Sequence, residues 1–214
     1  MTLALARRAM LAATAGWLAG CGAVPRAAAP SAGADVEAAA ATRAAYAALG
    51  PGINFGNMLD APSEGAWGSR VQDGYAALVR AAGFRHVRLP VRWSAHAGAD
   101  AQATIAPAFL ARVEGVVDAL LDQGLTVVVN MHHYRQLDGD RLDAGEAAVD
   151  PVVLKPRFVA MWRQIAARFA RHPQRLWFEL YNEPHRALDA SAASAFQAAA
   201  SSARCGPTTR SASS

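Results

Sequence analysis

The chain has 214 residues, a formal net charge of +4 and a hydrophobic content of 53%, which suit one domain or part of a larger one. Its positive charge is carried almost entirely by Arg and is spread along the sequence, so without a basic block or stripe we expect no nucleic-acid partner. The two cysteines, Cys21 and Cys205, lack the spacing of a zinc site.

The N-terminus has the organisation of an export signal. Two arginines, at positions 7 and 8, precede an apolar stretch that is too short to cross a bilayer as a mature helix. The following Leu18-Ala-Gly-Cys21 resembles a bacterial lipobox, which implies cleavage before Cys21 and lipid attachment to its sulfur; the alternative is an ordinary secretory signal with a chance Cys. We therefore expect a signal peptide over residues 1–21 and an Ala/Pro-rich tether over residues 22–46. The protein should be exported, either as a cell-envelope lipoprotein that touches the membrane only through its lipid anchor or as a periplasmic or extracellular protein.

After the tether, strand and helix patterns alternate. Short apolar or β-branched runs predict strands at residues 52–56, 86–89, 125–130 and 176–181. Apolar residues at helical spacing predict helices over residues 71–82, 107–123 and 155–171, with a further helix starting near Asp189. Strict alternation of strands and helices favours a parallel sheet.

The number of strand–helix units indicates how much of a fold the chain holds. An eight-unit barrel typically needs about 250 residues, and the sequence after the tether is shorter. We therefore predict an α/β fold, an incomplete (β/α)8 TIM barrel with about the first four strand–helix units, over residues 47–197. Residues 198–214 lose all apolar periodicity, so we expect an aberrant or disordered tail there, with a frameshift or truncation favoured over a designed tail.

Side chains alternate between the two faces of a strand, which predicts what each face carries. In the third strand, the apolar set Val127, Val129 and Met131 should face the helices, and the mixed set Thr126, Val128, Asn130 and His132 the barrel interior. In the fourth strand, the residues that should share one face are Trp177, Glu179, Tyr181 and Glu183. A carboxylate at Glu179 in a buried run needs a partner, and Arg88, in the second strand, is the candidate.

The fourth strand ends in Asn182-Glu183-Pro184. Pro184 cannot continue a hydrogen-bonded ladder, so Asn182 and Glu183 should lie together at the C-terminal tip of the strand, the edge at which parallel barrels carry their chemistry. A carboxylic acid beside an amide donor is suited to general acid/base work on a glycosidic bond. The structural alternative is that Glu183 caps the helix that follows.

Four segments, in order and at the spacing of barrel strands, match one family. They are Gly52-Ile-Asn-Phe-Gly-Asn57 with its continuation Ala61–Gly68, then Gly83–Trp93, Val127–Tyr134 and Asn182–His185. On these segments, residues 47–197 resemble glycoside hydrolase family 5, most closely the bacterial endoglucanases with broad β-glucan and mannan activity.

The resemblance implies endo-acting, retaining hydrolysis of β-1,4-linked polysaccharide, with cellulose or another β-glucan as the first substrate, mannan as the second, and no cofactor. In such a reaction two carboxyl groups stand about 5–5.5 Å apart across the scissile bond. Glu183 resembles the acid/base, Asn182 the residue that binds the sugar 2-OH, and Arg88 the partner of the nucleophile. The further sugar contacts that the resemblance implies are Asn57, Trp67, His132 and His133, with Trp67 as a stacking face.

The family nucleophile is a Glu at the tip of a seventh strand, and the sequence shows no such strand. We therefore expect the chain as written to be inactive; the alternatives are a non-catalytic carbohydrate-binding remnant and a non-functional fragment. His132, His133 and Glu183 are also residue types that bind zinc. Because neighbouring residues of a strand point to opposite faces, we expect no metal site there.

Overall fold

The computed structural model describes residues 36–37, 40, 43–44, 46–143, 146–173, 175–188 and 194. The chain divides into two compact units, Met1–Ala41 and Thr42–Ser214, and the features below belong to the second. The expected signal peptide with Cys21, most of the tether, nearly all of the helix expected near Asp189 and the tail over residues 198–214 lie outside the described residues. In the part of the chain that the structure describes, no helix has the length and apolar character to span a membrane.

The second unit is built on a four-stranded parallel sheet in the order β1-β2-β3-β4. The strands are β1 (Gly52–Asn54), β2 (His86–Leu89), β3 (Thr126–Asn130) and β4 (Leu176–Glu179). All four lie within the ranges predicted from the sequence. Each strand pairs with the next one along the chain, as successive strands in the wall of a barrel do.

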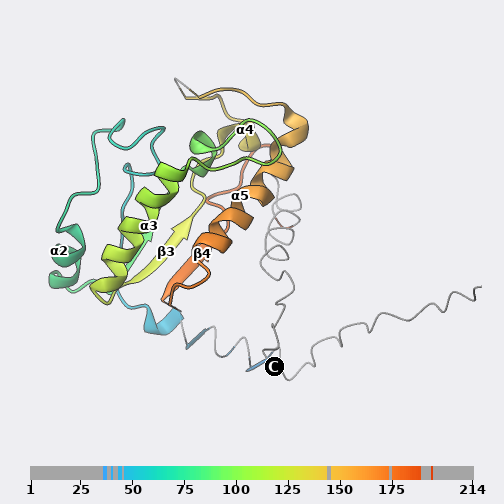
Figure 1. The fold of residues 1–214 in the computed structure, drawn as a ribbon. Coiled ribbons are helices and arrows are strands. Elements are labelled where there is room, and N and C mark those ends of the chain that lie inside the picture. Colours follow the sequence, from blue (N-terminus) through green and yellow to red (C-terminus); the bar gives the residue numbers. More distant parts are fainter. Residues whose placement is uncertain are drawn as a thin grey trace, which may run out of the picture. The chain divides into compact units, whose positions relative to one another are not determined.

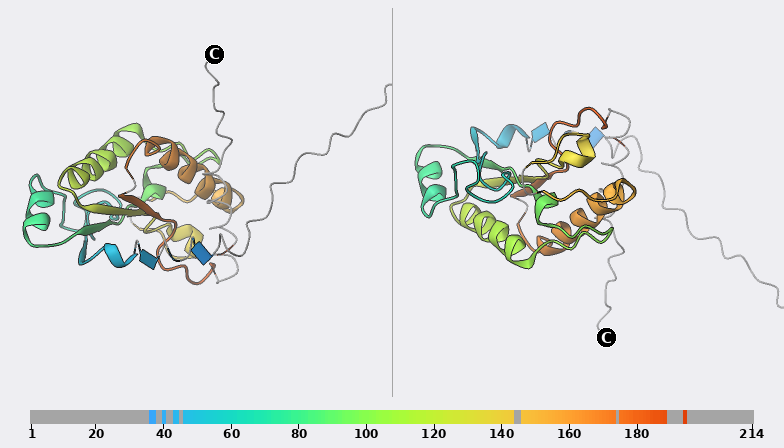
Figure 2. Two further views of the ribbon diagram at one scale, coloured as in Figure 1. Left: turned by 90° about the horizontal axis from the view of Figure 1, so that it is seen from below. Right: turned by 90° about the horizontal axis from the view of Figure 1, so that it is seen from above.

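The two long helices, α3 (Pro107–Asp122) and α5 (Leu154–Arg168), flank β3 and β4 and lie on one side of the sheet (Figures 1 and 2). The shorter helical elements are α2 (Tyr75–Ala81), α4 (Arg135–Asp138) and the 3₁₀ turns η1 (Trp93–His96) and η2 (Pro151–Val153). α3 begins at Pro107, whose missing N–H would have no partner in a first turn. α2 starts later than predicted because Gly74, immediately before it, has a left-handed φ of 86°.

The face of the sheet that meets the helices is apolar. Its fully buried residues are Val87, Leu89, Val127, Val129 and Met131. They share one core with the buried residues of α3 and α5, including Val113, Val117, Phe158, Trp162 and Ile165. The opposite face carries partly exposed side chains: Arg88, Val128 and Trp177, which are in register across β2, β3 and β4, and Glu179 of β4. The predicted faces of the third strand are therefore confirmed within β3.

The prediction that Tyr181 shares a face with Glu179 is wrong. Tyr181 is buried, its ring meets Phe158 of α5 edge-on at 5.8 Å between centroids, and its hydroxyl donates to Asp138 at 2.8 Å. The reason is that β4 ends at Glu179, so the strict alternation of an extended strand does not continue to Tyr181.

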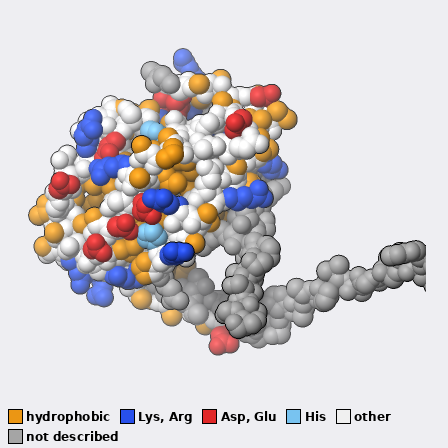
Figure 3. Space-filling model, in the orientation of Figure 1, with side chains coloured by type: hydrophobic (Ala, Val, Ile, Leu, Met, Phe, Trp, Pro, Cys, Tyr) orange, Lys and Arg blue, Asp and Glu red, His pale blue; other side chains and the backbone are white. Residues whose placement is uncertain are grey.

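The outer surface over α3 and α5 carries acidic and basic side chains interspersed with one another (Figure 3). Arg168 of α5 pairs with Glu114 of α3, and His172, just after α5, lies 3.0 Å from Asp118 of α3. Such exposed pairs contribute about 0–1 kcal/mol each. The buried apolar face, rather than these pairs, therefore holds the helices on the sheet.

Candidate active site

Arg88 on β2 forms the centre of a polar network at the C-terminal ends of the strands. Its Nε donates to Glu179 Oε2 at 2.7 Å and its Nη2 to Glu179 Oε1 at 2.6 Å, a bidentate geometry that makes charge-assisted hydrogen bonds strong. Asn130 Nδ2 donates to the same Oε1 at 3.2 Å. Burial alone would raise the pKa of Glu179, but the hydrogen bonds from Arg88 and Asn130 outweigh it and hold that pKa below its ordinary value. The predicted Arg88–Glu179 pair is confirmed.

Arg88 also orients Asn182. Its Nη2 donates to Asn182 Oδ1 at 2.7 Å, and its Nη1 donates to Asn54 Oδ1 at 3.2 Å. The backbone N–H of Asn182 donates to the Met131 carbonyl at 3.0 Å, which fixes the residue at the strand tip. Because the amide oxygen of Asn182 is already engaged, its NH2 group is the part presented to a ligand, and it can only donate.

Glu183 follows Asn182 and is exposed, with a left-handed φ of 42°. A φ of this sign is uncommon for a residue with a long side chain and is found where the surroundings hold the backbone in place. The hydrogen bonds that Arg88 donates to Glu179 raise the pKa of Arg88 most, and the nearby charge of Glu183 adds to that effect. Glu183 therefore lies exposed beside the network that Arg88 organises.

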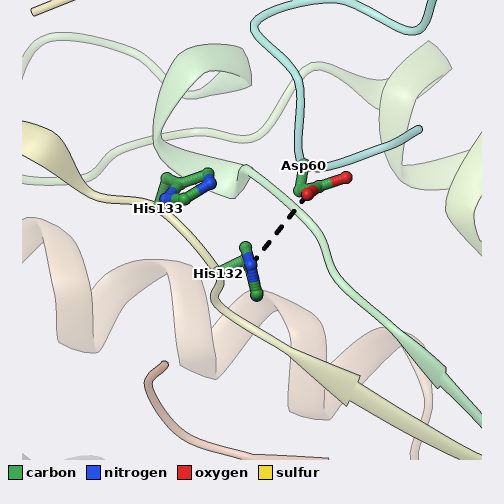
Figure 4. A group of neighbouring side chains, drawn as sticks. All are labelled: Asp60, His132 and His133. Atoms are coloured by element: carbon green, nitrogen blue, oxygen red, sulfur yellow. Dashed lines mark ion pairs between the residues drawn. The ribbon is translucent and has the colours of Figure 1, made fainter. Parts of the chain in front are cut away.

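His132 and His133 lie next to each other with Asp60 close by (Figure 4). Their rings meet edge-on at 4.6 Å between centroids, and His132 Nε2 is 4.0 Å from Asp60 Oδ2. One ligand atom from each of the three lies within 4.8 Å of the others, which is close enough for a shared cation. The prediction that the two histidines point to opposite faces is wrong, because β3 ends at Asn130 and the chain is no longer a regular strand where they lie.

Burial favours the neutral form of both histidines. Burial, and then the neighbouring His132, lower the pKa of His133 to about 4. Burial also lowers the pKa of His132, although the charge of Asp60 opposes this shift. A neutral imidazole has one donor and one acceptor nitrogen, which suits it to bind hydroxyl groups near neutral pH.

Trp67 completes this group. Its side chain is 39% exposed, its ring meets that of His133 edge-on at 5.7 Å, and the Arg92 guanidinium lies 5.3 Å from the ring centroid. Arg92 is fully buried and pairs with Asp143 at 2.6 Å. Trp67 is thus fixed from two sides while part of its ring stays open to a ligand. Asn57, which follows β1, is exposed with φ 62°, a conformation that Asn tolerates well.

The structure brings the predicted residues into two linked groups. Arg88 and Asn182 share one network, and Trp67 shares the other with the two histidines. Asn130 joins the groups, because its amide contacts both Glu179 and His132 Nδ1, the latter at 3.3 Å. Sequence reasoning missed Asp60 and Arg92. The available signal was a charged residue inside an apolar segment, which needs a partner when buried. Cys21, the predicted lipidation site, lies outside the described residues.

Asp138→Asn is expected to stabilise the chain by roughly 1–3 kcal/mol at pH 8, since one pKa unit corresponds to about 1.4 kcal/mol. Burial raises the pKa of Asp138 to about 6, so ionisation of its carboxyl opposes folding above that pH. Below about pH 4 the carboxyl is neutral in both the folded and the unfolded chain, and the substitution no longer adds stability. Asn keeps an acceptor for Tyr181. Urea unfolding at pH 8 and pH 4 measures the effect, with exposed Asp73→Asn as the control; an equal gain at both pH values would contradict the assignment.

The comparisons with known proteins agree on one family. The family model for cellulase (glycosyl hydrolase family 5) matches residues 50–204. Endoglucanase H of Acetivibrio thermocellus is 40% identical over 136 residues, which cover 64% of this chain and 14% of that protein. Endoglucanase A of Paenibacillus barcinonensis is 33% identical over 145 residues, which cover 64% and 36% of the two chains.

Solved structures give the same result. Thermotoga maritima Cel5A, determined with mannotriose, matches with a TM-score of 0.66 and 40% identity over 73% of this chain and 47% of that chain. The same protein with cellobiose matches at 41% identity and the same TM-score of 0.66. The chain therefore spans about half the length of these solved structures and a smaller share of the two endoglucanases. With the family model matched over most of its length and four parallel strands in barrel order, the chain belongs to glycosyl hydrolase family 5.

Proposed function

We propose that this chain supplies the acid/base half of the active site of a retaining endo-β-1,4-glucanase. The observation that carries the proposal is that the exposed carboxyl of Glu183 directly follows Asn182. The amide oxygen of Asn182 accepts a hydrogen bond from Arg88 at 2.7 Å. Membership of the cellulase family supports it. An amide fixed in this way presents a donor to the sugar beside the residue that would move the proton.

In the proposed reaction, protonated Glu183 donates its proton to the glycosidic oxygen while a second carboxylate attacks the anomeric carbon and the C–O bond breaks. Glu183 is then a carboxylate. It takes a proton from a water molecule whose oxygen attacks the same carbon, and the second carboxylate is released. Asn182 Nδ2 donates to the sugar 2-OH, a bond that strengthens as charge develops at the neighbouring anomeric carbon.

We infer that the second carboxylate comes from outside the described residues. Among the described carboxylates at the strand ends, Glu179 is bound by Arg88 and Asn130, and Asp60 accepts the Met58 N–H at 2.9 Å. Both oxygens of Glu179 and one oxygen of Asp60 are thus already engaged. One N–H of Arg88 Nη1 remains beyond its four side-chain hydrogen bonds, and we propose that it pairs with the incoming nucleophile.

The substrate class that we propose is β-glucan, with mannan as a second substrate. Thermotoga maritima Cel5A, which resembles this chain, was determined both with cellobiose and with mannotriose. Glucose and mannose differ at C2, which carries the hydroxyl assigned to Asn182. The Asn182 contact is therefore one point at which the two polymers would differ.

A chimaera tests the proposal directly. Residues 1–188 are joined to the part of Thermotoga maritima Cel5A that this chain does not match, which by the family pattern carries the seventh-strand Glu. We expect the chimaera to release reducing sugar from carboxymethylcellulose and the 214-residue chain alone to release none. Turnover by the isolated chain would refute the need for an outside nucleophile. If circular dichroism and a cooperative melt show that the chimaera is folded but it has no turnover, the proposal that this chain supplies the acid/base half of the active site is refuted.

Trp67→Ala is expected to weaken binding of cellohexaose to the chain by up to about tenfold, since an aromatic contact contributes roughly 0.5–1.5 kcal/mol. Trp67 is open on the side away from His133 and Arg92, so its truncation removes a sugar platform. Isothermal calorimetry at millimolar sugar measures the change. Leu78→Ala, at an exposed apolar residue of α2, is the matched control. If the Trp67 variant and the parent chain bind cellohexaose with equal affinity, Trp67 is not part of the sugar-binding surface.

A further inference from the structure

His185 faces a hydrogen-bond acceptor at each of its ring nitrogens. Its Nδ1 lies 2.6 Å from the backbone carbonyl oxygen of Glu183, and its Nε2 lies 3.2 Å from Asp140 Oδ2. A carbonyl and a carboxylate can only accept, and a neutral imidazole has a single N–H. Only the imidazolium, with both nitrogens protonated, can make both bonds.

These bonds join the segment that carries Glu183 to the turn after α4. The segment contains two residues other than Gly with left-handed backbone, Glu183 at φ 42° and Arg186 at φ 50°, so its conformation needs outside support. Further support comes from the Ala187 N–H, which donates to the Asp138 carbonyl at 3.0 Å. His185 is the member of this set whose bonding depends on a proton.

Charged groups surround His185 on every element packed against it. Asp138 Oδ1, at the end of α4, is buried, has no hydrogen-bond partner among the described residues and lies 4.0 Å from His185 Nδ1. Asp140 also contacts Arg186 Nη1 at 3.1 Å and Arg135 Nη1 at 3.7 Å. The two carboxylates are thus balanced by two arginines and by the imidazolium.

We propose that His185 is a positioning residue for Glu183. The imidazolium of His185 holds the segment that carries Glu183 against the turn after α4 and releases that segment when the proton is lost. The proposal rests on the proposed function of Glu183. The bond to the Glu183 carbonyl, and then the bond to Asp140, raise the pKa of His185 above its ordinary value. The stability that the protonated His185 contributes is therefore complete below the pKa of an unfolded histidine, about 6.5. It is lost as the pH rises through the higher pKa of the folded state.

Two readouts on the 214-residue chain test the proposal without any turnover. Long-range ¹H–¹⁵N spectra of the imidazole rings report which nitrogens carry protons; we expect His185 to be doubly protonated at pH 6 and to titrate above 6.5. After correction for intrinsic rates, hydrogen exchange at the Ala187 amide should rise about tenfold or more between pH 6 and pH 8.5 as the local structure opens. His185→Gln should make this rise smaller, and the part that remains comes from Asp138, whose ionisation above about pH 6 also opposes folding.

Asp140→Asn provides the second variant, because it keeps an acceptor for His185 Nε2 while removing the charge. We expect it to lower the pKa at which His185 titrates and to move the rise in Ala187 exchange to lower pH. A single neutral tautomer of His185 at pH 6 overturns the proposal, as does a rise in exchange that is the same in the parent chain and in His185→Gln. Failure of Glu183 as the acid/base would instead show only in turnover by the chimaera, so the two failures are distinguishable.

Discussion

Glu183→Gln is expected to lower turnover of carboxymethylcellulose by the chimaera about 10²–10⁴-fold, the usual contribution of a positioned general acid or base. Gln has the shape of a carboxylic acid, but it neither protonates the glycosidic oxygen nor accepts a proton from water. The loss should be much smaller for the first step on 2,4-dinitrophenyl β-cellobioside, whose leaving group departs without protonation. This difference between substrates separates loss of an acid from loss of folding.

A rescue experiment strengthens the measurement. In a retaining reaction the glycosyl–enzyme accumulates when its general base is missing, and added azide, which needs no base, should restore turnover of the aryl glycoside and give a glycosyl azide. Glu114→Gln, which removes a surface carboxylate that pairs with Arg168 on the outer helices, is the matched control and should keep parental rates. Equal losses on both substrates, without azide rescue, would exclude Glu183 as the acid/base.

Arg88→Ala is expected to destabilise the chain by about 2–4 kcal/mol at pH 7. Breaking a fully buried pair by removing one partner costs roughly 3–5 kcal/mol, and the estimate here is lower because the side chains of Arg88 and Glu179 keep 27% and 34% exposure. The variant leaves the Glu179 carboxylate with only Asn130 and releases the oxygen of Asn182. It should therefore weaken sugar binding as well as folding.

The pH dependence of this effect has a defined sign. The pKa of Glu179 is depressed in the folded state, so its stabilisation is present above the ordinary value and is lost as the pH falls through the folded value. The difference between the parent and Arg88→Ala should shrink from pH 7 to pH 3 in urea unfolding. The double variant Arg88→Met, Glu179→Leu should recover much of the loss, because no unpaired charge remains. A deficit that does not change with pH would show that the loss comes from packing and not from charge.

The strands and their faces could be predicted because regular strands follow a fixed period. The cost of an unpaired buried charge linked Glu179 of β4 to Arg88 of β2, and the observed bidentate pair agrees. Reasoning from the strand period failed two or three residues beyond the strand ends. Tyr181 turned to the helix side, and His133 came beside His132, because neither residue lies within regular strand.

The loop residues of the site could not be predicted for a different reason. Asp60 meets His132 from the segment after β1, and Arg92 meets Trp67 from the segment after β2. Those contacts depend on how irregular segments distant in sequence lie against one another, which no local period encodes. The double bonding of His185 is likewise a product of the turn after α4 meeting the segment after β4.

The Arg88–Glu179 pair joins β2 to β4 and passes over the interior side of β3. The pair therefore links the two strands that flank β3 and limits how far they can move apart. The relative position of β2 and β4 is therefore held by residues that these strands themselves carry. Further strands that joined this sheet would meet a β2–β4 link that is already formed, and Asn182, hydrogen-bonded to the same guanidinium, would keep its place.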